Sequence, residues 1–389
     1  MPNFRPGQVA LLVAQISLGL LAMTICLPSM QEWPAIFGAS QAAVQLTFSA
    51  YIVTFGGMQL VHGAWSDRIG RKPVLLFGLV LSAVGALLAA LAPNIGLLIA
   101  ARALQGAGTA ANMVVGRALV QDLYTGHDRT RVMALVGASM GVIPVTATLV
   151  GGHLHVQYGW QANFILLVAV SAALFLAAWR GLASTPAKAP GTVRRRLSLD
   201  YLELARTRGF VPYVVLLACT SGGFYTFLAG APAVFAGYGV KPDMLGWYMM
   251  TPGISYIVGN MLTSRLIRTH GERWLLMVGQ LTALSSILLV VGLSLGGVNT
   301  GLALSLPLLI LGVGHGMVVP PALTGTVGLV PAVAGTAAAV AGLMQQVGGA
   351  LGGFLVGLVP HNGNLGVGLL MLMWTLGGQA ALAALRRRP

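Results

Sequence analysis

The sequence predicts an all-α membrane protein in which twelve transmembrane helices form two pseudo-symmetric six-helix bundles. Its 389 residues are 56% hydrophobic and only 8% charged, whereas about a quarter of the residues of a soluble domain are charged. Twelve apolar stretches reach the length of about 20 residues that a helix needs to cross a bilayer. A polar, basic segment separates the first six stretches from the last six, which indicates a duplicated bundle.

The twelve expected spans follow one another through short connections. They lie near residues 9–30, 43–62, 74–93, 95–116, 132–154, 162–180, 210–232, 244–266, 274–295, 300–320, 334–358 and 364–385. We therefore expect an N-terminal bundle over 1–181, a cytoplasmic basic linker over 182–209 and a C-terminal bundle over 210–389. Gly70 and Gly271 each centre a short basic turn at equivalent places in the two sets of spans, which favours two related halves.

The net charge of +14 follows the expected topology. With the N-terminus in the cytoplasm, 20 of the 22 Lys and Arg residues fall in cytoplasmic segments, and only Lys241 lies outside and Arg102 within a span. This asymmetry follows the positive-inside rule and predicts that both termini are cytoplasmic. The basic surplus therefore needs no nucleic-acid partner, and membrane lipid is the expected surrounding of the spans.

The most distinctive segment is the loop that ends the second span, which reads G-A-W-S-D-R-I-G-R-K. Its defining residues are Gly63, Asp67, Arg68, Gly70, Arg71 and Lys72. Asp67 and Arg71 are four residues apart and can pair on one helical face, while Gly70 permits a tight turn. In sequence and position the loop resembles motif A of the major facilitator superfamily, G-x-x-x-D-R-x-G-R-K. The resemblance implies a transporter with twelve spans in two bundles.

In that superfamily the loop braces the cytoplasmic gate. The resemblance therefore implies that Asp67 and Arg71 dock against the neighbouring bundle and stabilise the outward-open state. It also implies a third member, an acid at the cytoplasmic end of the fourth span, and Asp122 stands there. The alternative is a solvated charged loop that only obeys the positive-inside rule.

Arg102 is the one basic residue that falls inside a span, the fourth. A charge at such depth is costly and indicates a function. Residues 98–108 resemble motif B of the superfamily, in which an arginine is linked to proton coupling. The alternative is a snorkelling or structurally paired arginine, with Glu32 near the outer end of the first span as its partner.

Further segments resemble the Bcr/CflA group of drug efflux transporters. They are residues 116–124, 159–164 and 223–232. Residues 137–152 resemble motif C of drug–proton antiporters, except that Thr148 stands near the expected proline. The group carries an aspartate within D-x-Y-L-P in the first span, where this chain has Thr24.

The proton-coupling site is not evident, because no acid lies near the middle of a span. The eight acids are Glu32, Asp67, Asp122, Asp128, Asp200, Glu203, Asp243 and Glu272. A proton-coupled carrier needs a titratable group that responds to the conformational change. The coupling candidates are Arg102, Glu32 and His315, and the loop acids also stay open. Histidine titrates near neutrality, although a lone buried histidine is more often a packed, hydrogen-bonded residue.

The same absence bears on the substrate. Without a carboxylate in mid-membrane, a lipophilic cation loses its strongest electrostatic partner, and Arg102 favours neutral or weakly acidic amphipaths. We expect the pocket between the halves to offer six polar contacts: Thr24, Tyr51, Gln105, Asn112, Tyr225 and Gln345.

These observations predict a monomeric, multi-pass transporter of the bacterial inner membrane. We expect it to export drugs or small amphipathic metabolites by alternating access in exchange for protons. An importer or symporter of a small organic solute is an alternative, because motif A does not set direction. A membrane-embedded enzyme or sensor is a remote alternative, since the sequence has no H-E-x-x-H, G-x-S-x-G or P-loop motif. We expect no enzymatic activity, cofactor or metal.

Overall fold

The fold is that of a computed structural model of the chain. It describes residues 6–182, 203–330, 334–360 and 363–386, and most of the expected linker, 182–209, lies outside these ranges. The described residues are almost entirely helical, and no strand occurs among them. The expected all-α class is therefore confirmed.

The described residues of the first half form seven α-helices and one short 3-10 helix. They are α1 (Pro6–Thr24), η1 (Pro28–Gln31), α2 (Trp33–Phe37), α3 (Gln41–Ile69), α4 (Arg71–Ala90), α5 (Ile95–Leu123), α6 (Gly126–Tyr158) and α7 (Gln161–Gly181). The α5 helix packs against α3, α4 and α1, so it lies in the interior of this half. Its many buried residues agree with that position.

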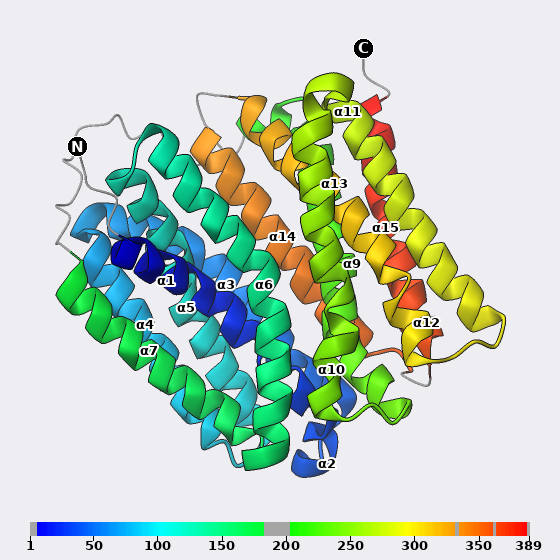
Figure 1. The fold of residues 1–389 in the computed structure, drawn as a ribbon, viewed down its shortest axis with the longest axis horizontal. Helices are drawn as coiled ribbons and strands as arrows, with labels where there is room; N and C mark the ends of the chain where they lie inside the picture. Colours follow the sequence, from blue (N-terminus) through cyan, green and yellow to red (C-terminus); the bar gives the residue numbers. More distant parts are fainter. Residues whose placement is uncertain (1–5, 183–202, 331–333, 361–362, 387–389) are drawn as a thin grey trace. The chain divides into compact units, whose positions relative to one another are not determined.

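Besides a short helical stretch at 203–206, the described residues of the second half form seven further helices. They are α9 (Phe210–Gly237), α10 (Pro242–Met249), α11 (Thr251–Leu295), α12 (Gly301–Ser305), α13 (Leu308–Gly328), α14 (Ala334–Val356) and α15 (Asn364–Arg386). The long α11 is broken at Gly271 into two arms. The α13 helix packs against both arms, and α9 packs against α14 and α15 (Figure 1).

The described helices account for the twelve expected spans. Ten helical stretches are long and apolar enough to cross a membrane. One of them, Pro242–Leu295, extends over 54 residues and is broken at Gly271, whose backbone leaves the helical region (φ 77°, ψ 170°). Counting its two arms separately and adding the 29-residue α5, which carries Arg102, gives twelve.

Local sequence signals explain several helix ends. The side chains of Ser40, Asn94 and Thr300 accept hydrogen bonds from backbone N–H groups three residues ahead, at 3.2, 2.9 and 3.2 Å, and so satisfy donors that a helix start leaves open. The two equivalent turns both use a glycine with positive φ: 98° at Gly70 and 77° at Gly271. This recurrence of turn geometry supports a duplicated construction.

Backbone contacts divide the chain into two compact units. The first unit comprises Met1–Pro190 and Pro242–Gly246, and the second comprises Gly191–Lys241 and Trp247–Pro389. The start of α10 belongs to the first unit because it meets α6 closely: a Cβ at Gly246 would lie 2.9 Å from the backbone nitrogen of Leu149. The expected domain boundaries, by contrast, assigned all of 210–389 to the second bundle.

Glycine allows the helices inside each unit to touch. In the first unit, a Cβ at Gly108 of α5 would lie 2.3 Å from the backbone nitrogen of Ser82 on α4. In the second unit, a Cβ at Gly314 of α13 would lie 2.6 Å from the carbonyl oxygen of Gly279 on α11. Close backbone approach of this kind is the main source of helix association in a bilayer. It also sets the positions of the polar side chains nearby.

Candidate functional site

A charged network joins the end of α3, the start of α4 and the end of α5. Arg71 forms ion pairs with Asp67 (Nη1–Oδ1, 2.8 Å) and Asp122 (Nε–Oδ2, 3.0 Å), and its Nη1 donates to Ser66 Oγ at 2.7 Å. The Arg71 side chain is 9% exposed, those of Asp122 and Asp67 32% and 50%. The expected Asp67–Arg71 pair is thus present with its third member, and Asp122 is the better shielded partner.

The other residues of this loop fasten the same end of the first unit. Lys72 Nζ donates to the carbonyl oxygens of Trp179 and Leu182, at 2.6 Å each, and so ties α4 to the end of α7. Gly63 faces α5, where a Cβ would lie 3.5 Å from a methyl group of Val114. Arg68 is exposed. The loop therefore connects α3 and α4 to both α5 and α7.

Arg102 is fully buried on α5, inside the first unit. Its Nη1 donates to the carbonyl oxygen of Ala22, at 2.8 Å, and to the amide oxygen of Gln105. The guanidinium lies 4.3 Å from the ring centroid of Tyr51. Its Nε and Nη2 have no hydrogen-bond partner among the described residues, and none of the ion pairs found there includes it. Arg102 is therefore a buried cation without a described carboxylate partner.

Four of the expected substrate contacts lie in the same unit, and all are fully buried: Thr24, Tyr51, Gln105 and Asn112. Tyr51 and Gln105 touch Arg102 directly, and the Tyr51 hydroxyl also bonds Gly19 O at 2.7 Å. Thr24 donates to the carbonyl oxygen of Leu20 in its own helix. The Asn112 amide has no hydrogen-bond partner among the described residues. Of these four residues, the structure thus brings Tyr51 and Gln105 into contact with Arg102.

Glu32 pairs with His155. Its Oε2 lies 3.0 Å from His155 Nε2, and the two side chains are 53% and 5% exposed. The pairing of Glu32 with Arg102, which the sequence left open, is wrong. Glu32 stands between η1 and α2, beyond the end of α1, where α6 presents His155.

The two remaining substrate candidates lie in the second unit. Tyr225 on α9 donates to the amide oxygen of Gln346 on α14 at 3.5 Å. The expected contact, Gln345, is partly buried one residue earlier in the same helix. Both candidates thus belong to the α9–α14 pair, and Gln346 is the glutamine that meets Tyr225.

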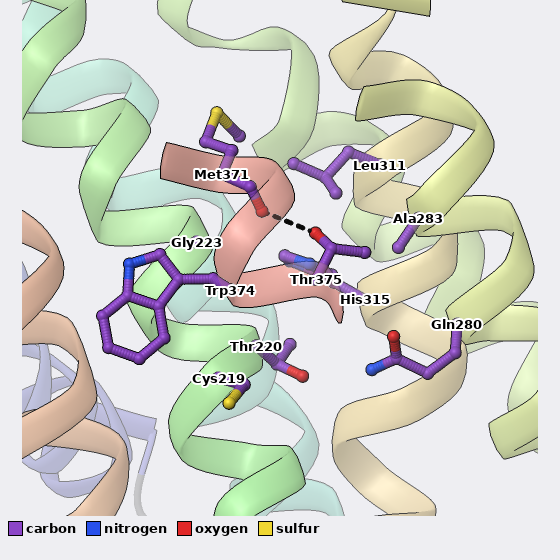
Figure 2. A pocket seen from close by; sticks show the side chains of 10 residues that line it. All are labelled: Cys219, Thr220, Gly223, Gln280, Ala283, Leu311, His315, Met371, Trp374 and Thr375. Atoms are coloured by element: carbon purple, nitrogen blue, oxygen red, sulfur yellow. Dashed lines mark hydrogen bonds between the residues drawn. The ribbon is translucent and has the colours of Figure 1, made fainter. Parts of the chain in front are cut away.

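His315 lies on α13 and lines a small cavity inside the second unit (Figure 2). The other polar residues that line it are Cys219 and Thr220 on α9, Gln280 on α11 and Thr375 on α15. Gln280 and His315 are 3% and 8% exposed. The structure therefore places His315 in a polar group contributed by four helices.

The second unit also has a bonded group at its Gly271 bend. The Tyr213 hydroxyl on α9 donates to Glu272 Oε1, immediately after the bend in α11. Glu272 also lies beside α13, where a Cβ at Gly325 would be 2.7 Å from its Oε1. Glu272 therefore occupies the place after its turn that Arg71 occupies after Gly70.

Sequence reasoning missed Ser66, His155 and Gln280. Ser66 lies inside the signature loop, but at a position where the motif allows any residue, so the motif did not indicate a role for it. His155 sits 123 residues from Glu32, and no sequence spacing links them. Gln280 carried one usable signal, since it is an amide within an apolar span. Among the described residues no group of three or more His, Cys, Asp or Glu is placed to hold a metal ion.

Comparison with known proteins decides the family. The family model described as Major Facilitator Superfamily matches residues 11–353. The chain belongs to this superfamily. Like other members it is a multi-pass membrane transporter rather than an enzyme. The suggested two-bundle fold and the Bcr/CflA resemblance are confirmed.

Several relatives of this superfamily member carry names connected with drug resistance. Multidrug resistance protein D of Escherichia coli is 31% identical over 374 residues, 94% of this chain and 92% of the relative. A chloramphenicol resistance protein of Pseudomonas aeruginosa is 28% identical over 351 residues, 89% of this chain and 82% of the relative. A bicyclomycin resistance protein homolog of Haemophilus influenzae is 28% identical over 68% of each chain.

A solved structure has the same fold. It is a bacterial homolog of the human lysosomal transporter Spinster, in an inward-facing and unoccupied conformation. The TM-score is 0.76 over 100% of this chain and 96% of the other, at 15% identity. At this identity the likeness shows the fold alone.

Proposed function

We propose that this transporter exports drugs or small amphipathic metabolites in exchange for protons. The drug-resistance names of relatives that align over nearly the whole chain carry this proposal. The positive-inside distribution of Lys and Arg supports cytoplasmic termini. On that orientation the Arg71 network lies at the cytoplasmic end of the first bundle and braces the gate there.

The interior of the first unit supports neutral or weakly acidic substrates. Arg102 is a fixed charge, and its described surroundings are carbonyl oxygens, an amide and an aromatic ring. Among the described residues no carboxylate offsets this charge, so a cationic substrate would be repelled while an acidic group would supply the missing partner. Tyr51, Gln105 and Asn112 add polar groups to this region for substrate contact in a state that opens it, and Tyr225 and Gln345 provide them in the second unit.

The test uses inverted and right-side-out membrane vesicles loaded with a pH-sensitive dye. Chloramphenicol is the neutral probe and ethidium the cationic one. We expect chloramphenicol to collapse an imposed pH gradient in vesicles that contain the protein, with accumulation in inverted vesicles. Accumulation only in right-side-out vesicles would indicate an importer, and transport of ethidium alone would contradict the proposed substrate class.

A further inference from the structure

The cavity inside the second unit is a polar site that the transport of a drug-like substrate does not explain. It lies among α9, α11, α13 and α15, and its size corresponds to about one water molecule. Figure 2 shows the amide of Gln280 pointing toward the middle of the lining group, whereas the indole of Trp374 is turned away. The cavity is thus too small for a drug but has room for one water molecule, which can carry a proton.

The polar groups around the cavity need a partner that the described residues do not supply. Gln280 Oε1 is buried without a hydrogen bond, and no hydrogen bond to the His315 ring occurs in the described part of the chain. The hydroxyls of Thr220 and Thr375 donate to carbonyl oxygens of their own helices, both at 2.8 Å. Their oxygens therefore remain acceptors. Since buried polar groups are normally paired, a water molecule that donates and accepts here would satisfy the site.

Backbone contacts hold His315 and Gln280 in place. Gly279 and Gly314, the residues immediately before them, meet where α11 crosses α13, and a Cβ on either would lie within 2.8 Å of the other's carbonyl oxygen. On the other arm of α11, Thr263 donates to the carbonyl oxygen of Gly316 at 2.9 Å. The segment of α13 around His315 is therefore clamped between the two arms, and the imidazole is held by a rigid backbone.

His315 is the group in this cavity that can accept a proton and become positively charged. Among the described residues that line it, Cys219 on α9 is the only other titratable side chain. The α12 and α14 helices contain no titratable residue, and α15 has only Arg386 at its end. On α9 and α11 the remaining groups are Tyr213, Tyr225, Tyr256, Arg265, Arg268, His270, Glu272 and Arg273. Glu272 lies beside Gly325, ten residues along α13 and so about 15 Å from His315.

We propose that this cavity binds a water molecule and that His315 takes up the coupling proton from it. A hydronium ion gives its proton to the free imidazole nitrogen, which leaves neutral water and an imidazolium. Gln280 Oε1 and the threonine oxygens accept hydrogen bonds from the imidazolium and the water molecule. This inference rests on the proposed proton antiport. It also places the proton in the second unit, whereas the polar group around Arg102 lies in the first.

The other two buried histidines of the described spans, His62 and His155, do not share the surroundings of His315. Both ring nitrogens of His62 on α3 are also buried without a described hydrogen-bond partner, but its ring packs against those of Trp65 and Phe77, with centroid separations of 6.2 and 6.3 Å. Aromatic packing encloses it, and it does not line the cavity. His155 is paired with Glu32 near a helix end. His315 is therefore the histidine whose surroundings suit proton exchange with water.

The first test measures protonation directly. Protein labelled with ¹⁵N-histidine is reconstituted in liposomes, and the His315 ring signal is assigned by its loss in His315→Gln. We expect the ring to exchange with water and to become protonated as the pH is lowered from about 8 to about 4, and Gln280→Leu to displace that transition. A ring that stays neutral and unexchanged over this range overturns the proposal, whether or not the protein transports any drug.

The second test separates coupling from transport. In proteoliposomes, His315→Gln should keep chloramphenicol exchange across the membrane in the absence of a pH gradient and lose accumulation driven by the gradient. His153→Gln, at an exposed histidine of α6, is the matched control and should keep both. Gradient-driven accumulation by His315→Gln overturns the proposal. So does loss of both activities in folded His315→Gln and His315→Asn, because His315 would then serve substrate passage. Absence of exchange by the wild type refutes the proposed function instead.

Discussion

Replacing Asp122 with asparagine should destabilise the first unit more than replacing Asp67. Both acids bond Arg71, but the Asp122 side chain is 32% exposed and that of Asp67 50%. A hydrogen bond to a charged group contributes about 1.5–3 kcal/mol, and partial screening lowers the expected cost of Asp122→Asn to about 1–2 kcal/mol. The Asp67 pair is an exposed i,i+4 contact within one helical segment, so its loss should cost about 0.3–0.5 kcal/mol.

Equilibrium unfolding in mixed micelles of dodecyl maltoside and sodium dodecyl sulfate, followed by tryptophan fluorescence, measures both losses. Arg71→Gln completes a double-mutant cycle with each acid, which isolates the pair from other effects of the substitution. The coupling energy with Asp122 should be several times that with Asp67. Equal couplings, or a larger one for Asp67, would refute the reasoning from burial.

Three further outcomes follow from named contacts. Gly108→Ala should lower the free energy of unfolding by about 1–3 kcal/mol, because its Cβ would lie 2.3 Å from the backbone nitrogen of Ser82. Gly137→Ala is the control, since nothing lies within 4 Å of its Cβ position. Equal unfolding midpoints for the two variants would contradict the close crossing. Arg102→Lys should lower chloramphenicol efflux about tenfold. A lysine keeps the charge but loses the planar contact with Tyr51, which contributes about 1–2 kcal/mol when desolvated. Unchanged efflux would count against a role for this contact. Tyr213→Phe should lower the thermal unfolding midpoint more than Tyr238→Phe, because Tyr213 bonds a carboxylate and Tyr238 an amide oxygen, and the reverse order would exclude this explanation.

The spans and the signature loop could be predicted because each depends on local sequence. An apolar stretch of sufficient length needs no tertiary information, and the pairing of Asp67 with Arg71 follows from helical spacing. The helix ends were harder to predict from the sequence. The α3 helix continues to Ile69, beyond the expected end at 62, because a helix does not stop where the apolar stretch does. It ends at Gly70, whose φ of 98° breaks it.

The interior contacts could not be predicted, because they depend on how helices cross. Glu32 meets His155 through the packing of α6 beside η1, and nothing in their spacing indicates it. The cavity around His315 similarly requires four helices that are far apart in sequence. Its position depends on the crossing of Gly279 and Gly314, and a glycine in a span gives no sign of which helix it will meet.

The absence of an acid from the middle of the spans changes what each unit can contribute to transport. An arginine side chain does not lose its proton in proteins, so the Arg102 position can distinguish substrates by charge but cannot carry a proton between the two sides. A histidine has the opposite property, since it gains and loses charge near neutrality. A carrier that keeps these two roles on separate units can change its substrate preference through residues around Arg102 without altering proton uptake at His315. Under the proposed function, substitutions of Tyr51 or Gln105 should therefore change which drugs are exported while the pH dependence of export stays the same.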